Sequence, residues 1–216
     1  MQSKRREVLT GLVTVAGMGL IAGCAEKREP EVTPGEDLMQ EHGLLERVLL
    51  IYDEAAMRIE RNAELDTVVI EMSAQLVQRF IEGYHEKSEE NSVFPRMQKA
   101  GVEKELVATL LQQHEAGRVI TSSILTLAQG PGSPELAGAL REFVRMYRPH
   151  AAREETVLFP AFRSVIGRHG YHELGEQFED EEHRLFGKHG FEDAVKEVTK
   201  LEAALGLAEL NTFTPA

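Results

Sequence analysis

The feature that most constrains the fold is a residue pattern that occurs twice along the chain. Residues 85–95 and 150–160 each begin with a His, carry a Glu pair four and five positions later, and end in Phe-Pro. We call these two copies the first and second His–Glu motifs. On an α-helix, residues four positions apart lie one above the other. His85 with Glu89, and His150 with Glu154, therefore each direct an imidazole and a carboxylate toward a common point. Transition metals of the iron or zinc type accept this combination of ligands.

The hydrophobic spacing from Glu36 onward is helical, with no convincing strand pattern. Apolar stripes at this spacing run along four segments: residues 38–59, 70–89, 107–128 and 136–157. Ser133 is placed to cap the fourth helix, with Pro134 in its first turn. Pro149 lies inside that helix and predicts a kink just before His150. Four amphipathic helices joined by short connections predict an all-α, up-and-down four-helix bundle.

One His falls on the core-facing stripe of each predicted helix: His42, His85, His114 and His150. A single buried His is ordinarily satisfied by a local hydrogen bond. Four at once, two of them followed by Glu one turn later, are not easily explained as independent cases. Buried polar groups without partners each cost roughly a few kcal/mol. A shared metal centre would satisfy all of these groups together, and the cores of helix bundles are where such centres are built.

These residues resemble the hemerythrin-like, or HHE cation-binding, family. The resemblance covers about residues 38–165 and rests on Glu41-His42, on the two His–Glu motifs and on His114. It implies a four-helix bundle around two non-haem iron ions in an oxo-bridged di-iron centre. The metal ligands that it implies are His42, His85, Glu89, His114, His150 and Glu154.

The chain departs from the oxygen-carrying members of that family. Those members have a His-x-x-x-His pair on the third helix, where this chain has Arg118 at the second position. They also have His-x-x-x-x-Asp on the fourth helix, in place of His150-x-x-x-Glu154. Either a coordination position is open to water or substrate, or another residue such as Glu86 fills it. Arg118 cannot ligate iron because its guanidinium stays protonated; if it faces the site, we expect it to stabilise an anionic ligand.

Gly117 lies on the same stripe as His114, three residues further on. The absence of a side chain there has two interpretations. It leaves room for a diatomic ligand beside the site, or it allows close helix packing.

The N-terminal residues predict export. Lys4-Arg5-Arg6 precedes an uncharged stretch that ends in Leu20-Ile-Ala-Gly-Cys24, which resembles a bacterial lipoprotein cleavage box. The paired arginines also resemble a twin-arginine signal. We expect an export signal peptide at residues 1–23, transport across the bacterial inner membrane, and a lipid on Cys24 that anchors the protein to a membrane. The alternative is a short membrane helix, for which the stretch is too short and too rich in Gly.

The remaining boundaries follow from composition. Residues 24–36 are charged and contain Pro, which is typical of a tether. The bundle is then expected at residues 37–166 and a C-terminal helical extension at 167–216. In that extension, Glu179 and His183 share a stripe and are candidates for extra metal ligands. A solvated acidic face is the interpretation we favour, since runs of charge usually face solvent.

The sequence favours one function over two alternatives. The favoured function is that of an exported, membrane-tethered di-iron protein that binds or reduces oxygen or a related small oxidant. Its electrons would come from a donor that the sequence does not identify. One alternative is an iron, oxygen or redox sensor or binding module. The other is a structural bundle that its metal only staples. The net charge of −12 disfavours nucleic acid as a partner, and no catalytic residue is predicted.

Overall fold

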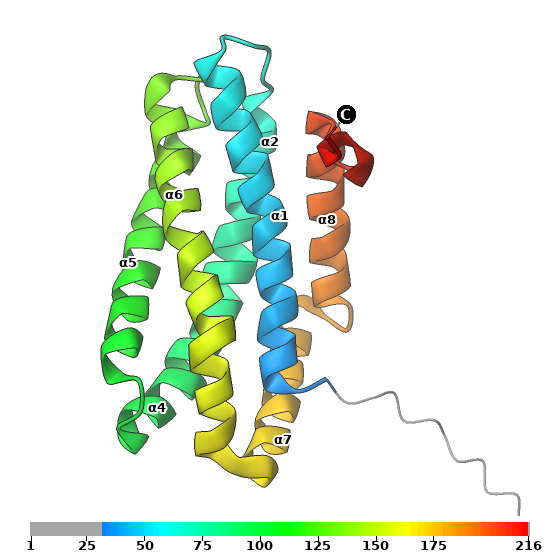
Figure 1. Ribbon diagram of the computed structural model, residues 1–216. Coiled ribbons are helices and arrows are strands. Elements are labelled where there is room, and N and C mark those ends of the chain that lie inside the picture. The colour runs from blue at the N-terminus through cyan, green and yellow to red at the C-terminus, as the bar shows by residue number, and fades with distance from the viewer. Residues whose placement is uncertain (1–31, 216) are drawn as a thin grey trace, which may run out of the picture. The chain divides into compact units, whose positions relative to one another are not determined.

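The computed structural model describes residues 32–215, and these residues form helices with no strand (Figure 1). The predicted signal peptide and Cys24 lie outside the described residues, as does most of the predicted tether. None of the helices within residues 32–215 is long and apolar enough to cross a membrane.

The first and third helices of the bundle are single elements, α1 (Pro34–Glu60) and α5 (Lys104–Leu127). The second helical run consists of five consecutive segments: α2 (Thr67–Leu76), the π-helical η1 (Val77–His85), α3 (Glu86–Ser88), the π-helical η2 (Glu89–Val93) and α4 (Phe94–Ala100). The fourth run comprises α6 (Pro134–Arg153), the π-helical η3 (Glu154–Leu158) and α7 (Phe159–Phe186). The chain ends in α8 (Gly190–Leu205) and the short 3-10 helix η4 (Leu210–Phe213). The all-α prediction is therefore confirmed.

Two side-chain caps fix where helices begin. Ser133 accepts a hydrogen bond from the backbone N–H of Leu136, so its predicted role as the cap of α6 is confirmed. Thr33 and Glu36 form a capping box, in which each side chain accepts from the other residue's backbone N–H. α1 consequently begins at Pro34, inside the segment predicted to be a tether.

The four runs pack in the order α1, α6, α5 and α2, each beside the next, and α2 with η1 closes the bundle against α1 (Figure 1). α8 lies along α1 and α2 as a fifth helix. α6 continues through Pro149 to Arg153 as a helix. The helical path breaks later, at Gly167, whose φ of 71° and ψ of 170° are non-helical.

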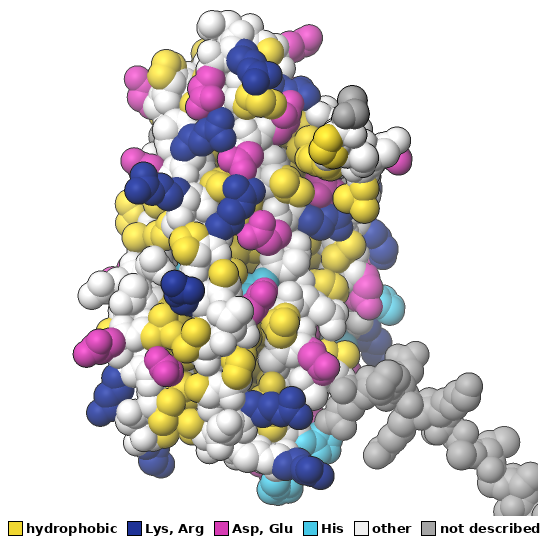
Figure 2. Space-filling view, in the orientation of Figure 1, with side chains coloured by type: hydrophobic (Ala, Val, Ile, Leu, Met, Phe, Trp, Pro, Cys, Tyr) yellow, Lys and Arg dark blue, Asp and Glu magenta, His cyan; other side chains and the backbone are white. Residues whose placement is uncertain are grey.

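The core of the bundle consists of two apolar clusters. The larger contains Leu45, Tyr52 and Phe143, and the smaller contains Leu38, Phe94 and Phe162. On the outside, basic and acidic side chains are interspersed over the upper part of the face formed by α1 and α6 (Figure 2). Arg141 and Arg148 of α6 both pair with Asp53 of α1. Polar side chains are also buried inside the bundle, and they include four histidines and the glutamates Glu89 and Glu154.

Candidate metal centre

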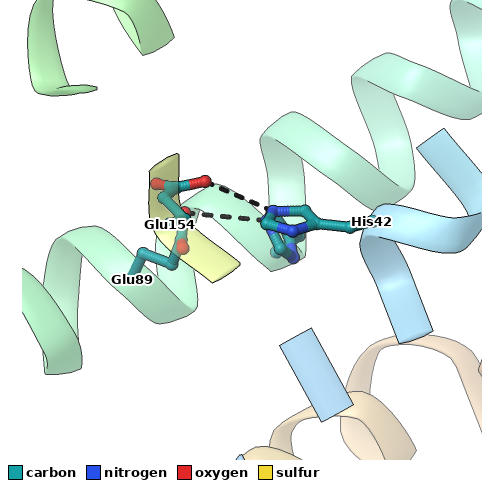
Figure 3. Close-up of side chains that lie close together, drawn as sticks. His42, Glu89 and Glu154 are labelled. Atoms are coloured by element: carbon teal, nitrogen blue, oxygen red, sulfur yellow. Dashed lines mark ion pairs between the residues drawn. The ribbon is translucent and has the colours of Figure 1, made fainter. Parts of the chain in front are cut away.

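Two glutamates, one from each His–Glu motif, meet at the centre of the buried polar set. Glu89 is the first residue of η2 and Glu154 is the first residue of η3, and both side chains have no exposed surface. Their carboxylates lie side by side and face the ring of His42 (Figure 3). Two carboxylates in such proximity repel each other unless a proton or a cation lies between them.

Four histidines surround these carboxylates, one from each helical run, and all four are buried. Glu154 Oε2 lies 3.3 Å from His42 Nε2 and 3.1 Å from His150 Nε2. Glu89 Oε2 lies 3.6 Å from His85 Nε2 and 3.5 Å from His114 Nε2. The structure therefore brings together all six residues that the sequence singled out, and each histidine presents the same ring nitrogen to the centre.

These ligand atoms divide into two neighbouring groups that share Glu154. One group is His42, His85, Glu89 and Glu154, and the other is His114, His150 and Glu154; within each, the potential ligand atoms lie within 4.8 Å of one another. We call them the first half and the second half of the centre. Each half has the imidazole and carboxylate donors that a divalent transition metal accepts.

The other ring nitrogen of every histidine contacts a side-chain oxygen. The Nδ1–acceptor distances are 3.2 Å for His42 with Glu155, 2.6 Å for His85 with Glu41, 3.1 Å for His114 with Glu90, and 2.9 Å for His150 with Gln113. An oxygen acceptor favours the tautomer with its proton on Nδ1, which leaves the Nε2 lone pair directed at the centre. Metal-binding histidines are oriented in this way in proteins.

The Phe-Pro ending of each motif has a local structural role. Proline has no N–H and its ring displaces the carbonyl one turn earlier, so a regular α-helical turn is unfavourable before it. The residues preceding the two prolines, Phe94 and Phe159, instead donate to the carbonyls of Glu89 and Glu154, five residues earlier. Such π-helical turns often occur at functional sites.

The same two phenylalanines also pack against histidines of other helices. Phe94 stacks on His114 with ring centroids 5.5 Å apart, and Phe159 stacks on His42 at 5.6 Å. Each motif therefore supplies its own His and Glu to the centre, and its second Glu and its Phe hold a histidine of a helix outside the motif.

Electrostatics within the centre push its groups toward different protonation states. Burial raises the pKa of Glu89 well above its usual value, and the neighbouring charge of Glu154 raises it further. Burial alone would raise the pKa of Glu154, but His150 and His42 outweigh it and hold that pKa low. Burial would lower the pKa of His42, yet its contacts with Glu154 and Glu155 raise it to about 9. Burial lowers the pKa of His114 to about 4.

Several atoms at the centre are buried without a hydrogen-bond partner. They include Nε2 of His42 and of His114 and both carboxylate oxygens of Glu89 and Glu154. An unpartnered buried polar atom costs about 1–3 kcal/mol, and a charged one costs more. A cation bound between these lone pairs would satisfy all of them, so the residues present fit a metal ion.

Glu86 and Arg118 lie in a network beside the centre. Arg118 Nη1 donates to Glu86 Oε2 at 2.6 Å and to Glu90 Oε1 at 2.9 Å, and the hydroxyl of Tyr147 donates to Glu86 Oε1 at 2.6 Å. Glu86 groups with Glu90 and His114, and belongs to neither half of the centre. Because Arg118 is paired with two carboxylates, its charge is largely offset, and the expectation that it stabilises an anion at the centre has no support.

Gly117 packs against Tyr147. A Cβ at this position would lie 2.0 Å from the Tyr147 hydroxyl oxygen, so the space left by the missing side chain is filled by that hydroxyl. Of the two interpretations of Gly117, close helix packing is the one the structure supports.

The C-terminal candidates lie apart from the centre. Glu179 is exposed and His183 is half-buried on α7, and within residues 32–215 neither belongs to a group of metal-ligand atoms. The sequence interpretation gave no role to the four residues that contact Nδ1 of the histidines, which are Glu41, Glu90, Gln113 and Glu155. The signal available was their position: Glu41 and Gln113 immediately precede His42 and His114, and Glu90 and Glu155 immediately follow the first Glu of each motif.

Comparison with known proteins agrees with this geometry. The family profile described as Hemerythrin HHE cation binding domain matches residues 33–162. Uncharacterized proteins of Mycobacterium tuberculosis and Mycobacterium bovis are each 38% identical to this chain over 232 residues, covering 98% of this chain and 91% of the relative. No solved structure matches the chain significantly.

Proposed function

Because this chain belongs to the hemerythrin HHE cation-binding domain family, we propose that it is a di-iron protein that binds or reduces oxygen or a related small oxidant. The observation that carries the proposal is the common orientation of the four histidines. Each has an oxygen acceptor at Nδ1 and directs Nε2 at two carboxylates without exposed surface. A histidine that only filled the core would have no reason to share this arrangement with three others.

The ligand set is one that iron accepts. Imidazole and carboxylate suit iron in two oxidation states, as they also suit zinc, and no Cys lies at the centre among residues 32–215. A pair of irons would supply electrons to an oxidant and accept them back from a donor. The chain's own residues would hold the pair, orient the imidazoles and exclude bulk water, since Phe94 and Phe159 cover two of the rings.

The first test is metal content. Metal-free protein loaded with ferrous iron under anaerobic conditions should bind two irons per chain, and air should change its visible spectrum. His85→Ala and His150→Ala should each lose metal, because each removes a nitrogen ligand. His169→Ala is the matched control, since His169 is 88% exposed and pairs only with Glu173 among the described residues.

The outcomes separate the proposal from its alternatives. One iron per chain in the wild type, or full metal retention in both ligand variants, would contradict it. Protein that takes up zinc as readily as iron, and whose iron form shows no redox change in air, would favour a structural staple. A spectrum that reverts when oxygen is removed under vacuum would favour oxygen storage over oxidant reduction.

We also propose that the mature protein acts outside the inner membrane as a lipoprotein. The support is the sequence of residues 1–24, with its basic start, uncharged stretch and terminal Cys24. This location would place the centre where oxidants arriving from outside the cell are met first.

A further inference from the structure

The two His–Glu motifs make matching contacts with the histidines of the other two helical runs. Glu90 and Phe94 of the first motif hold His114, at 3.1 Å and 5.5 Å. Glu155 and Phe159 of the second motif hold His42, at 3.2 Å and 5.6 Å. The contacts also run in the other direction. The residue before His42 accepts a hydrogen bond from His85 of the first motif, and the residue before His114 accepts one from His150 of the second.

The match fails at the residue that precedes each of these histidines. Before His42 stands Glu41, whose carboxylate lies 2.6 Å from His85 Nδ1; before His114 stands Gln113, whose amide oxygen lies 2.9 Å from His150 Nδ1. Glu41 is only 1% exposed. Gln113 is half-buried and, together with His150, lines a groove of about 320 Å³ between α5 and α6.

This difference between Glu41 and Gln113 distinguishes the two halves of the centre. In the first half, His42 and His85 both have a carboxylate behind them, from Glu155 and Glu41. In the second half, His150 has only the neutral amide of Gln113 behind it. A carboxylate behind an imidazole increases the negative charge that reaches the metal through the ring, and a neutral amide does not.

Arg118 increases the difference. Its Nη1 lies 2.9 Å from Oε1 of Glu90, the same oxygen that lies 3.1 Å from His114 Nδ1. Arg118 also pairs with Glu86, so one positive charge is shared by two carboxylates on that side. Among the described residues no Lys or Arg is paired with Glu41 or Glu155. The histidines of the first half therefore contact carboxylates that have no Lys or Arg partner among the described residues, whereas the one carboxylate behind the histidines of the second half, that of Glu90, is paired with Arg118.

We infer that the two halves bind metal with unequal affinity, and that Gln113 is the positioning residue that sets the difference. The half with His42 and His85 fills first. The half with His114 and His150, which adjoins the groove, holds the second and more readily exchanged ion. This inference rests on the proposed metal centre but not on the identity of its metal or on its reaction with oxygen.

The experiment is a titration of metal-free protein with Co²⁺, followed by visible absorption and by competition with a chelator. The wild type should fill in two steps. Gln113→Glu should strengthen the second step about tenfold, the low end of what outer partners of metal ligands contribute, and leave the first step unchanged. Gln112→Glu is the matched control: Gln112 is exposed on the same helix and adds the same charge without the contact to His150.

A charge swap locates the effect. Glu41→Gln should weaken the first step, and the double variant Glu41→Gln with Gln113→Glu should restore two steps in the opposite order. Adding His150→Ala then identifies the half that fills first, since it should spare the tight step in the wild-type background and abolish it in the swapped one. Circular dichroism of each variant confirms that it is folded.

The outcomes distinguish the inference from the proposal beneath it. Two cobalt ions bound in one step that Gln113→Glu does not change would overturn the inference and leave the metal centre standing. An equal effect of Gln112→Glu would also overturn it, because general surface charge would then be the cause. Folded wild-type protein that binds neither cobalt nor iron would refute the metal centre itself.

Discussion

The contact between Gly117 and Tyr147 makes a sharp stability prediction. In Gly117→Ala the new Cβ would lie 2.0 Å from the Tyr147 hydroxyl oxygen and 2.8 Å and 2.9 Å from two ring carbons. Heavy atoms cannot approach this closely, so the Tyr147 side chain or the helix backbone at residue 117 must move. Tyr147 is buried and donates to Glu86, so movement of its ring also threatens that hydrogen bond.

Three contributions decide the magnitude. Overpacking a core by one methyl group costs about 1–3 kcal/mol. Leaving the buried Glu86 acceptor unpaired costs about another 1–3 kcal/mol. Replacing Gly by Ala within a helix contributes about 1 kcal/mol in the opposite direction. The balance is a loss of about 3 kcal/mol, which lowers the melting temperature of a chain of this size by about 6–12 °C.

The assay is thermal unfolding of the metal-free protein, followed by circular dichroism. Gly138→Ala is the control, since a Cβ at that exposed position on α6 meets nothing within 4 Å and should raise the melting temperature by about 2–4 °C. Adding Tyr147→Phe to Gly117→Ala removes the closest contact and should restore part of the loss. If Gly117→Ala stabilised the protein as Gly138→Ala does, the packing argument would be refuted.

Three further predictions concern protons and location. Burial beside Glu41, Glu182 and Glu179 raises the pKa of Asp37 from 3.8 to about 8, so the unfolded chain binds fewer protons than the folded one between these pH values. Urea unfolding of metal-free protein should therefore show the free energy of unfolding falling as the pH rises from about 4 to about 8. Asp37→Asn should flatten that slope. Metal must displace protons from His42 and Glu89, whose pKa values are raised, so cobalt affinity should fall as the pH is lowered from about 9 to about 6. Calorimetry in buffers of different ionisation enthalpy should detect the released protons. An affinity independent of pH would contradict this prediction. Intact mass of membrane-fraction protein should show cleavage before Cys24 and an attached lipid, whereas a Cys24→Ser protein that remained in the membrane would indicate an uncleaved anchor.

The sequence alone determined the helices and the residue types that make up the centre. Helical spacing and i, i+4 pairs are local properties, so the stripes predicted four helical runs and the motifs placed His85 with Glu89 and His150 with Glu154 on common faces. The same locality explains why Ser133 could be predicted as a cap, since a cap is set by the next three residues.

Only the tertiary structure decided which groups from different helices meet. That Glu41 holds His85 and Gln113 holds His150 depends on how α1 packs beside η1 and how α5 packs beside α6, which no spacing within one helix encodes. The role of Arg118 was decided in the same way, because Glu86 and Glu90 reach it from the second helical run, which packs beside α5. Hydrophobic spacing specifies which face of a helix is buried, whereas the rotation and neighbour of that face are fixed only when the whole core packs at once.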